Sequence, residues 1–384
     1  MIGERGGAPR QWRKQKISTI QLFAMMFLFD LGTALVVDYG ITAKKDAWLA
    51  ILLGMGGGMV LFFIYYSLFR QYPSLPLTGY ARKIFGKYLG WIIGLLYILY
   101  FLYIAARIVR DFGDLLLSSA LSKTPLLAII ILFVLVICYL LYLGIEVLGR
   151  TAEVFIVILL LFGVAGNFFI LVSGDVNLQN LQPFLENGWK PILTTAFPTI
   201  ISFPFGQMLI FMMLLPYLNR PRLVKKVWLS ALISSGLILC WTASLNIAVL
   251  GVEVTERATF PTLETLRKVN FLEFIQRLDA IVVFSMLITM LFKASILLYC
   301  ALIGMVDLFK LNNYQSILLP SGVILIFFSM IIGSNYSEIR EDGGDVLYYY
   351  LNIPLLIIIP LLMLLVVMIR NGFKKKGRSK LNET

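Results

Sequence analysis

The stretch FPTIISFPFGQ at residues 197–207 lies inside an apolar segment long enough to cross a membrane, yet it contains two prolines and a glycine. Proline removes a backbone donor and clashes with the preceding turn, and glycine relaxes the backbone. We therefore predict that a membrane helix is broken here. Such breaks persist at membrane depth only where protein or a wet cavity satisfies the freed backbone groups, and they can form ligand sites. A proline kink with only a packing role is the alternative.

The composition is that of a protein with many membrane spans. Of the 384 residues 14% are charged, whereas soluble domains are about one-quarter charged. A span needs about 20 mostly apolar residues. Ten segments meet this requirement: 18–37, 47–69, 89–116, 125–143, 153–172, 191–216, 227–250, 274–306, 316–332 and 353–369. We predict an all-α polytopic membrane protein, with a ten-helix domain over 18–369 between a cytoplasmic tail at 1–17 and a basic cytoplasmic tail at 370–384.

The distribution of Lys and Arg predicts the orientation, because these residues concentrate on the cytoplasmic side. If residues 1–17 are cytoplasmic, the inner loops collect most of the 33 basic residues, and the outer loops hold most of the acids. Both termini are then inside. The net charge of +12 is thus a signal of topology and not of nucleic-acid binding. We expect no cleavable signal peptide, because the first 17 residues are polar and basic.

Two connections have patterns of their own. Residues 76–88 are amphipathic and basic on the inner side, which predicts a short helix lying on the membrane surface, against lipid. Residues 251–273 are too polar to span the membrane. From Thr262 onward, after Pro261, they predict an outer re-entrant or lid helix, and a plain surface loop is the alternative.

The second half of the chain mirrors the first half in outline. The first span is interrupted at Asp30-Leu31-Gly32-Thr33, and the sixth at 197–207. Paired interruptions in two halves indicate an inverted-repeat transporter site. We therefore predict two repeats of five spans each, over about 18–172 and 191–369. This arrangement, with broken helices 1 and 6, resembles the LeuT-type fold.

Ionisable side chains inside spans are rare and costly, so each is a candidate functional group. The third span carries two pairs with i,i+4 spacing, Arg107 with Asp111 and Arg110 with Asp114. A self-paired polar stripe is the structural interpretation. In the functional interpretation, Arg107 lines the ligand path or its outer gate, with Asp111 as a gating charge. Arg277 and Asp279, at the outer end of the eighth span, form an interfacial pair or a gate.

Lys293 lies near the middle of the eighth span with no acid within four residues. A buried ammonium has to find a carboxylate or carbonyls elsewhere, or lose its proton. Asp30 lies at about mid-depth beside the first break, and spans 1 and 8 are neighbours in the LeuT-type fold. We hypothesise that Lys293 pairs with Asp30, or with carbonyls of the broken first span, in place of a sodium ion. Sodium coupling is then not expected. The alternative is that Lys293 extends to the inner surface.

The sequence contains no pattern typical of an enzyme. It has no histidine, which excludes His-based triads, His metal sites and His proton relays, and its three cysteines have no ligand spacing. The run GMGGG at 54–58 lacks the Lys-Ser/Thr of a phosphate loop, and close helix packing explains it better. We expect no enzymatic activity, no cofactor and no metal site.

Several motifs together resemble one family. They are Gly79-Tyr80 with IFGKYLG at 84–90 and LLYILY at 95–100, the broken FPFGQ at 203–207, and FPTL at 260–263 followed by Phe274 and Arg277-Leu278-Asp279-Ala280. With the length and the ten spans, they are similar to the B subunits of the spore-germination receptors of endospore-forming bacteria. These endospore germination permeases belong to the amino acid–polyamine–organocation superfamily. The resemblance covers essentially the whole chain.

The resemblance implies a nutrient-sensing receptor subunit in the inner membrane of the spore. Such a subunit looks like an amino-acid permease, binds a small nutrient such as an amino acid, and triggers germination together with a larger membrane A subunit and a lipoprotein C subunit. The resemblance also implies a ligand site among spans 1, 3, 6 and 8. By position this site contains Gly32, Thr33, Phe203, Pro204, Phe205, Gly206, Gln207, Arg107 and Thr289.

Two other functions fit the same fold prediction. A secondary amino-acid transporter would use the same site, and uptake of labelled solute distinguishes it from a receptor. A purely structural membrane protein would leave the paired interruptions unexplained.

Overall fold

The computed structural model describes residues 16–35, 37, 40–268, 279–332 and 346–381, without the side chains of 279, 346 and 372–381. Its main helices are α1 Thr19–Leu31, α2 Ala47–Gln71, α3 Leu77–Phe85, α4 Lys87–Ser119, α5 Leu126–Tyr142, α6 Ile145–Val172, α7 Trp189–Thr194, α8 Val224–Leu250, α9 Val252–Arg257, α10 Pro261–Lys268, α11 Asp279–Phe309, α12 Gln315–Ile331 and α14 Ile359–Leu381. The 3-10 segments include η2 Gly32–Leu35, η3 Ile41–Asp46 and η6 Phe205–Met213, and the π-helical segments are η5 Thr195–Ile200 and η9 Val346–Ile358.

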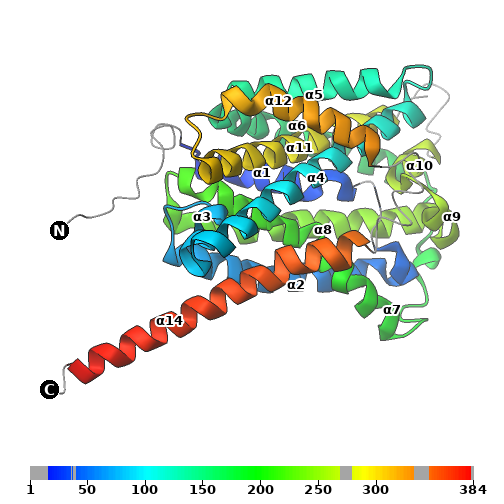
Figure 1. The fold of residues 1–384 in the computed structure, drawn as a ribbon. Helices are drawn as coiled ribbons and strands as arrows, with labels where there is room; N and C mark the ends of the chain where they lie inside the picture. The colour runs from blue at the N-terminus through cyan, green and yellow to red at the C-terminus, as the bar shows by residue number, and fades with distance from the viewer. Residues whose placement is uncertain (1–15, 36, 38–39, 269–278, 333–345, 382–384) are drawn as a thin grey trace.

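The long helices run side by side in one bundle (Figure 1). Helix α3 and the far end of α14 lie at one end of the bundle, which we call the inner end. Helices α9 and α10 lie at the opposite end, which we call the outer end.

The described helices match the predicted membrane segments. Seven are long and apolar enough to cross a membrane, and three more are apolar but shorter, namely Thr19–Leu35, Leu126–Tyr142 and Gln315–Ile331. Each of the ten predicted segments overlaps one of these helices. The all-helical membrane fold is therefore confirmed, whereas crossing by the three shorter helices stays a prediction.

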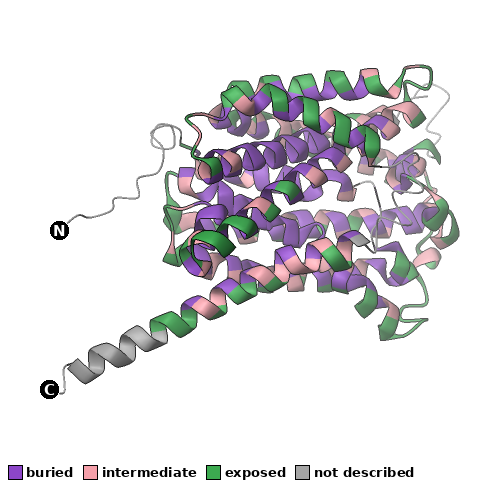
Figure 2. Ribbon diagram, viewed as in Figure 1, coloured by how far each residue is buried: buried purple, intermediate pink, exposed green. Residues whose placement is uncertain are grey.

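Helix α5 shows why the bundle suits a membrane. Many of its side chains are exposed at the edge of the bundle (Figure 2), and the large ones among them are apolar, including Leu132, Leu135 and Val136. A helix at the surface of a soluble protein turns polar residues outward. This face is therefore suited to contact with lipid.

Helix α1 lies at the centre of the bundle, in contact with α6, α8 and α11. A capping box starts it: Gln21 N donates to Ser18 Oγ at 3.1 Å, and Ser18 N donates to the Gln21 side chain at 2.9 Å. Just before this cap, Ile17 N donates to Tyr217 O at 2.9 Å, and Asn219 N donates to Ile17 O at 3.0 Å. The start of the first span is thus joined by backbone hydrogen bonds to the end of the sixth.

Both predicted interruptions are present. At the end of α1, Gly32 adopts φ 28° and ψ −126°, and the chain continues as η2. In the sixth span, Phe197 leaves the helical region with φ −124° and ψ 127°, and Phe203 and Pro204 form a turn before η6. Because proline has no N–H, the regular hydrogen-bond ladder cannot continue through Pro204.

The tenth span also departs from a regular α-helix, which the sequence analysis did not predict: it is π-helical over η9 and continues directly into α14. In an α-helix the carbonyl of Leu356 would accept from the N–H of residue 360, and Pro360 has none. Tyr65 of α2 donates to Leu356 O at 2.6 Å, and Tyr97 of α4 donates to Leu355 O at 2.7 Å. Tyrosine hydroxyls from neighbouring helices thus bond to carbonyls of this irregular span.

The GMGGG run of α2 packs against the broken sixth span. A Cβ atom at Gly54 would overlap Ile200, and one at Gly58 would overlap Phe205. Only glycine lets the two backbones approach so closely at these positions. This confirms the packing interpretation of the run.

The predicted helix at 76–88 forms as α3, but its position requires a correction. Leu77, Tyr80 and Ile84 are fully buried, and α3 packs on α4, so its apolar face meets protein and not lipid. Arg82 of α3 forms an ion pair of 2.5 Å with Asp307 near the end of α11. This pair holds α3 against the bundle.

The helix predicted in the outer connection is present as α10, which begins at Pro261. The alternative of a plain surface loop is therefore wrong for residues 261–268, and residues 269–273 lie outside the described part of the chain.

Tyr65→Phe is expected to lower the thermal stability of the purified protein, because the buried Leu356 carbonyl loses its donor. Leaving such a group unsatisfied costs about 1–3 kcal/mol. The measurement is the midpoint of thermal denaturation in detergent. Tyr66→Phe is the matched control, since the Tyr66 ring stacks on Phe62 and its hydroxyl has no hydrogen bond within the described residues. Equal midpoints for the two variants would contradict this role of Tyr65.

Candidate functional site

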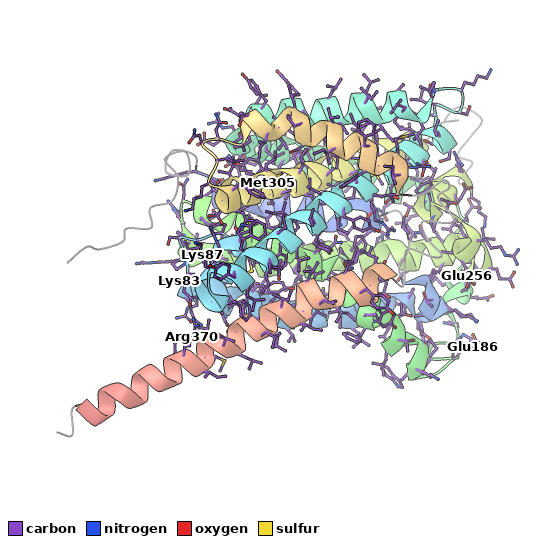
Figure 3. The ribbon with its side chains drawn as sticks, viewed as in Figure 1. Lys83, Lys87, Glu186, Glu256, Met305 and Arg370 are labelled. Carbon is purple, nitrogen blue, oxygen red and sulfur yellow. The ribbon has the colours of Figure 1, made fainter. Side chains whose placement is uncertain are left out.

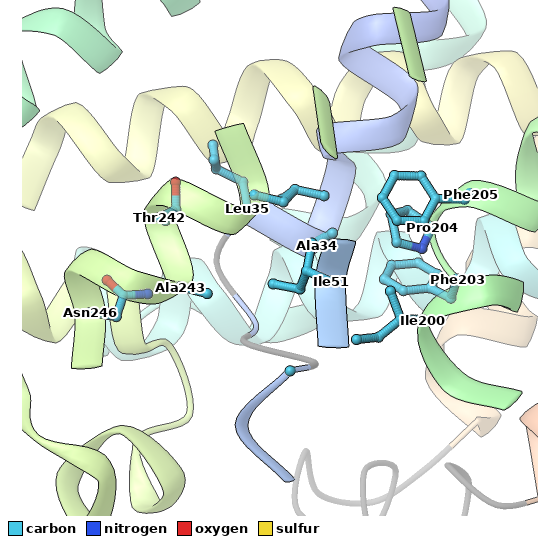
Figure 4. A pocket seen from close by; sticks show the side chains of 12 residues that line it. Ala34, Leu35, Ile51, Ile200, Phe203, Pro204, Phe205, Thr242, Ala243 and Asn246 are labelled. Atoms are coloured by element: carbon cyan, nitrogen blue, oxygen red, sulfur yellow. The ribbon is translucent and has the colours of Figure 1, made fainter. Parts of the chain in front are cut away.

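A cavity lies between the two interruptions (Figure 4). Its wall comes from the first, second, sixth and seventh spans, through Ala34, Leu35, Gly40, Ile51, Ile200, Phe203, Pro204, Phe205, Leu239, Thr242, Ala243 and Asn246. Most of these side chains are aliphatic or aromatic, and none of them is ionisable. The polar side chains are Thr242 and Asn246. Such a wall suits a small solute with an apolar body and few polar groups.

Five predicted site residues lie in this wall or beside it. Phe203, Pro204 and Phe205 line the cavity directly. Gly32 and Thr33 come immediately before the part of η2 that lines it. The structure therefore brings the two predicted interruptions together at one cavity.

The other predicted residues do not line the cavity. Gly206 packs beside the Ile201 carbonyl, and Gln207 is almost fully buried. Thr289 Oγ1 of α11 donates to Gly32 O at 3.0 Å, so it bonds to the backbone of the first break. Arg107 lies on α4, which contributes nothing to the wall.

The wall therefore uses spans 2 and 7 where the prediction placed spans 3 and 8. Helices α4 and α11 pack closely along each other, whereas α8 presents Leu239, Thr242, Ala243 and Asn246 to the cavity. The sequence contained one signal for this surface. Thr242 and Asn246 are polar residues one helical turn apart in an apolar span, so they lie on one face.

Lys293 of α11 contacts the same aromatic wall from within the bundle. Its side chain is fully buried, and a Cβ atom at Gly32 would overlap its aliphatic stem. Its Nζ lies 4.2 Å from the centre of the Phe203 ring and 4.9 Å from that of Phe29. A desolvated cation over an aromatic face gains about 2 kcal/mol. The side chain points into the bundle, so the alternative in which it extends to the inner surface is wrong.

Asp30, in the last turn of α1, is fully buried in the same region. Its Oδ2 accepts a hydrogen bond from the Ser235 hydroxyl of α8. Within the described residues, Asp30 Oδ1 and Lys293 Nζ have no hydrogen-bond partner. No direct ion pair between Asp30 and Lys293 is present among the described side chains. The first and eighth spans thus contribute an acidic and a basic side chain to one buried region.

The charges of the third span are arranged partly as predicted. Arg110 pairs with Asp114 at 3.1 Å, as the i,i+4 spacing indicates. Arg107 Nη1 lies 3.5 Å from the Tyr103 hydroxyl. The predicted pair or gate of Arg277 and Asp279 cannot be located, because Arg277 lies outside the described residues and the side chain of Asp279 is not described.

Comparison with known proteins places this chain in a family. A family model described as spore germination protein matches residues 16–337. Spore germination protein KB of Bacillus subtilis (strain 168) is 38% identical over 96% of this chain and 97% of its own length. The chain belongs to the spore germination protein family. Spore germination protein A2 of the same organism is 25% identical over 82% of this chain and 86% of its own length.

Two solved structures share the fold of this spore germination protein. MhsT in complex with L-phenylalanine superposes with a TM-score of 0.67 at 14% identity, covering 91% of this chain and 89% of its own. Mhp1, a nucleobase-cation-symport-1 family transporter with bromovinylhydantoin bound, has a TM-score of 0.64 at 16% identity, covering 87% and 76%. The shared fold is the LeuT-type transporter fold. At these identities the likeness extends to the fold alone.

Gly32→Ala is expected to destabilise this spore germination protein, because φ of 28° strains any L side chain and the new Cβ would overlap Lys293. Backbone strain of this kind costs about 1–3 kcal/mol. Gly56→Ala in α2 is the matched control, since no atom lies within 4 Å of its added Cβ. Thermal denaturation in detergent measures both variants. A Gly32→Ala midpoint equal to that of Gly56→Ala would show that the first break tolerates a side chain.

Proposed function

We propose that this spore germination protein is the B subunit of a nutrient receptor and binds a small solute, an amino acid, between the two broken spans. The cavity between the interruptions carries the proposal, because it combines an apolar wall with backbone groups freed from regular helices. The bound molecules named for MhsT and Mhp1, L-phenylalanine and bromovinylhydantoin, are small organic compounds. They support a solute of similar size here.

The geometry suggests how an amino acid would bind. Helix η6 begins at Phe205 in the cavity wall, and the positive end of its dipole favours a carboxylate. Backbone carbonyls at the end of η2 would accept hydrogen bonds from the ammonium group. Phe203 and Phe205 would shape the space for the side chain. Gln207, Arg107 and Thr289 remain proposed site residues at the margin of the cavity. The solute would contact them if the bundle moves on binding.

We propose the complete architecture on the same grounds. All ten apolar helices cross the membrane, in two inverted repeats of five over about 18–172 and 191–369. The inner end of the bundle is cytoplasmic, and both tails, 1–17 and 370–384, lie on that side. The membrane is the inner membrane of the spore.

The proposed signal is a shift in population. Solute occupancy favours a closed state over an open one, because the closed state binds the solute more tightly. The A and C subunits then sense the closed state and trigger germination.

Deleting the genes of both partner subunits should abolish germination while solute binding to the purified protein persists. Loss of binding after that deletion would place the site at a subunit interface.

A secondary amino-acid transporter is the second candidate. The observation that favours it is the shared fold with Mhp1, a transporter. Uptake of labelled solute into vesicles, driven by a proton or sodium gradient, would support transport. Binding without uptake would support the receptor. We propose no catalytic activity for either role.

We propose further that Lys293 serves as a fixed cation between the first and eighth spans, in place of a coupling ion. Its contacts with Gly32 and Phe203 support this position, since both residues belong to the interruptions. A fixed charge holds the two broken segments together without a dissociable ion.

Gly206→Leu is expected to abolish solute binding, because its Cβ would meet the Ile201 carbonyl and Leu61 and shift the backbone beside Phe205. Thermal-shift screening of the wild-type protein against amino acids, sugars and nucleosides first identifies a stabilising solute, and the variant is then tested with that solute. Gly163→Leu, with no atom within 4 Å of its added Cβ, is the control. Retained stabilisation in Gly206→Leu would move the site elsewhere.

Lys293→Met is expected to abolish nutrient-triggered germination or assembly of the protein in the membrane, because the buried centre loses its cation and leaves the Asp30 charge unbalanced. The fall in optical density of a spore suspension and the amount of protein in spore membranes measure the two effects. Lys310→Met, at an exposed position at the end of α11, is the control. Normal germination and normal abundance in Lys293→Met would refute the fixed-cation role.

A further inference from the structure

The outer helix α10 is hydrogen-bonded to the wall of the cavity. Thr262 Oγ1 donates to Leu35 O, at the end of η2, with a distance of 2.9 Å. Asn246 Nδ2 of α8 in turn donates to Thr262 Oγ1 at 3.1 Å. Leu35 and Asn246 both line the cavity. One hydroxyl of α10 therefore joins the first broken span to the seventh span at the cavity wall.

Thr265, one turn further along α10, adds a second contact to the same amide. Its Oγ1 lies 2.9 Å from Asn246 Oδ1 and 3.0 Å from Pro261 O, so the hydroxyl can donate to either oxygen. Thr265 is fully buried, and Asn246 is 3% exposed. Breaking buried hydrogen bonds without replacing them is unfavourable. When the Thr265 hydroxyl donates to Oδ1, Asn246 holds α10 through both its nitrogen and its oxygen.

The Asn246 amide has hydrogen-bonding capacity left for a solute. An Asn side chain offers two N–H donors and two acceptor lone pairs, and α10 uses one of each. Thr242 and Asn246 lie on the same side of the cavity (Figure 4). A polar group of a solute can therefore bond to this amide without displacing Thr262 or Thr265.

We propose that Asn246 couples occupancy of the cavity to closure of α10, with the Thr262 and Thr265 hydroxyls as the latch. The latched helix restricts entry to the cavity from the outer end. A solute bonded to the amide fixes its orientation and so strengthens both threonine contacts. The solute group at Asn246 is one that donates or accepts hydrogen bonds. By linkage, the solute stabilises the latch by the same factor by which the latch raises solute affinity.

This inference rests on the proposed function only in treating the cavity as a solute site. The latch itself consists of contacts within the chain. It can therefore be tested without knowing the solute.

Accessibility of the cavity wall tests the latch directly. Ala243→Cys, in a background with Cys138, Cys240 and Cys300 replaced by Ala, places a thiol between Thr242 and Asn246. A membrane-impermeant methanethiosulfonate reagent is added to membrane vesicles, and the rate of labelling is measured. Adding Thr262→Val and Thr265→Val keeps the shape of α10 and removes both hydroxyls. The labelling rate should rise about tenfold, the effect expected from losing two hydrogen bonds.

Two further variants distinguish loss of the latch from misfolding of the protein. Thr262→Val alone changes a half-buried position and should raise the rate by a smaller factor. Thr255→Val in α9 removes an equally buried hydroxyl whose 2.7 Å bond goes to Gly251 O, and it should leave the rate unchanged. An unchanged rate in both Thr262 variants, or an equal rise in Thr255→Val, would overturn the latch.

Solute protection completes the experiment. L-glutamine, L-serine and L-phenylalanine are added at millimolar concentration before labelling of Ala243→Cys. A solute that binds should slow labelling, and the slowing should disappear in the Thr262→Val/Thr265→Val background. If the latch variants raise the rate and none of the three solutes binds, the latch stands and the amino-acid proposal loses support. If a solute slows labelling equally with and without the latch, the coupling through Asn246 is wrong and the solute site stands.

Figure 3 shows the two ends of the bundle, between which a signal from this latch would have to travel. Glu186 and Glu256 lie at the outer end, and Lys83, Lys87 and Arg370 lie at the inner end. A partner subunit that responds to α10 therefore contacts the outer end or responds to helices that run the length of the bundle.

Discussion

The structure depends on one constraint, which is that every backbone group freed by an interrupted helix has to find a partner inside the bundle. At the first break, Thr289 donates to the Gly32 carbonyl and Thr262 donates to the Leu35 carbonyl. In the tenth span, Tyr65 donates to the Leu356 carbonyl. Each of these donors comes from a different helix. The interruptions therefore determine where polar side chains of α2, α10 and α11 stand in an otherwise apolar interior.

The buried centre at Lys293 extends the same logic to charge. An ammonium in an apolar bundle needs compensation, and here the faces of Phe29 and Phe203 contribute to it. Because Phe203 also lines the cavity, a movement of this ring on solute binding would reach Lys293 at once. The centre thus connects the cavity to α11 through a single aromatic side chain.

The two ends of the bundle are held in different ways. At the inner end, backbone hydrogen bonds join Ile17 to the end of the sixth span, and Arg82 pairs with Asp307. At the outer end, the hydroxyls of Thr262 and Thr265 hold α10 at the cavity wall.

The sequence by itself determined the class of fold, the two main interruptions and the family, because apolar segment length, proline and glycine act locally wherever they occur. It also indicated that Phe203, Pro204 and Phe205 face the site. Only the tertiary structure decided that α2 and α8 complete the wall, that Asn246 belongs to it, and that Lys293 lies over two aromatic rings. Those outcomes depend on which faces of distant helices meet, and uniformly apolar spans carry little periodic signal to orient them.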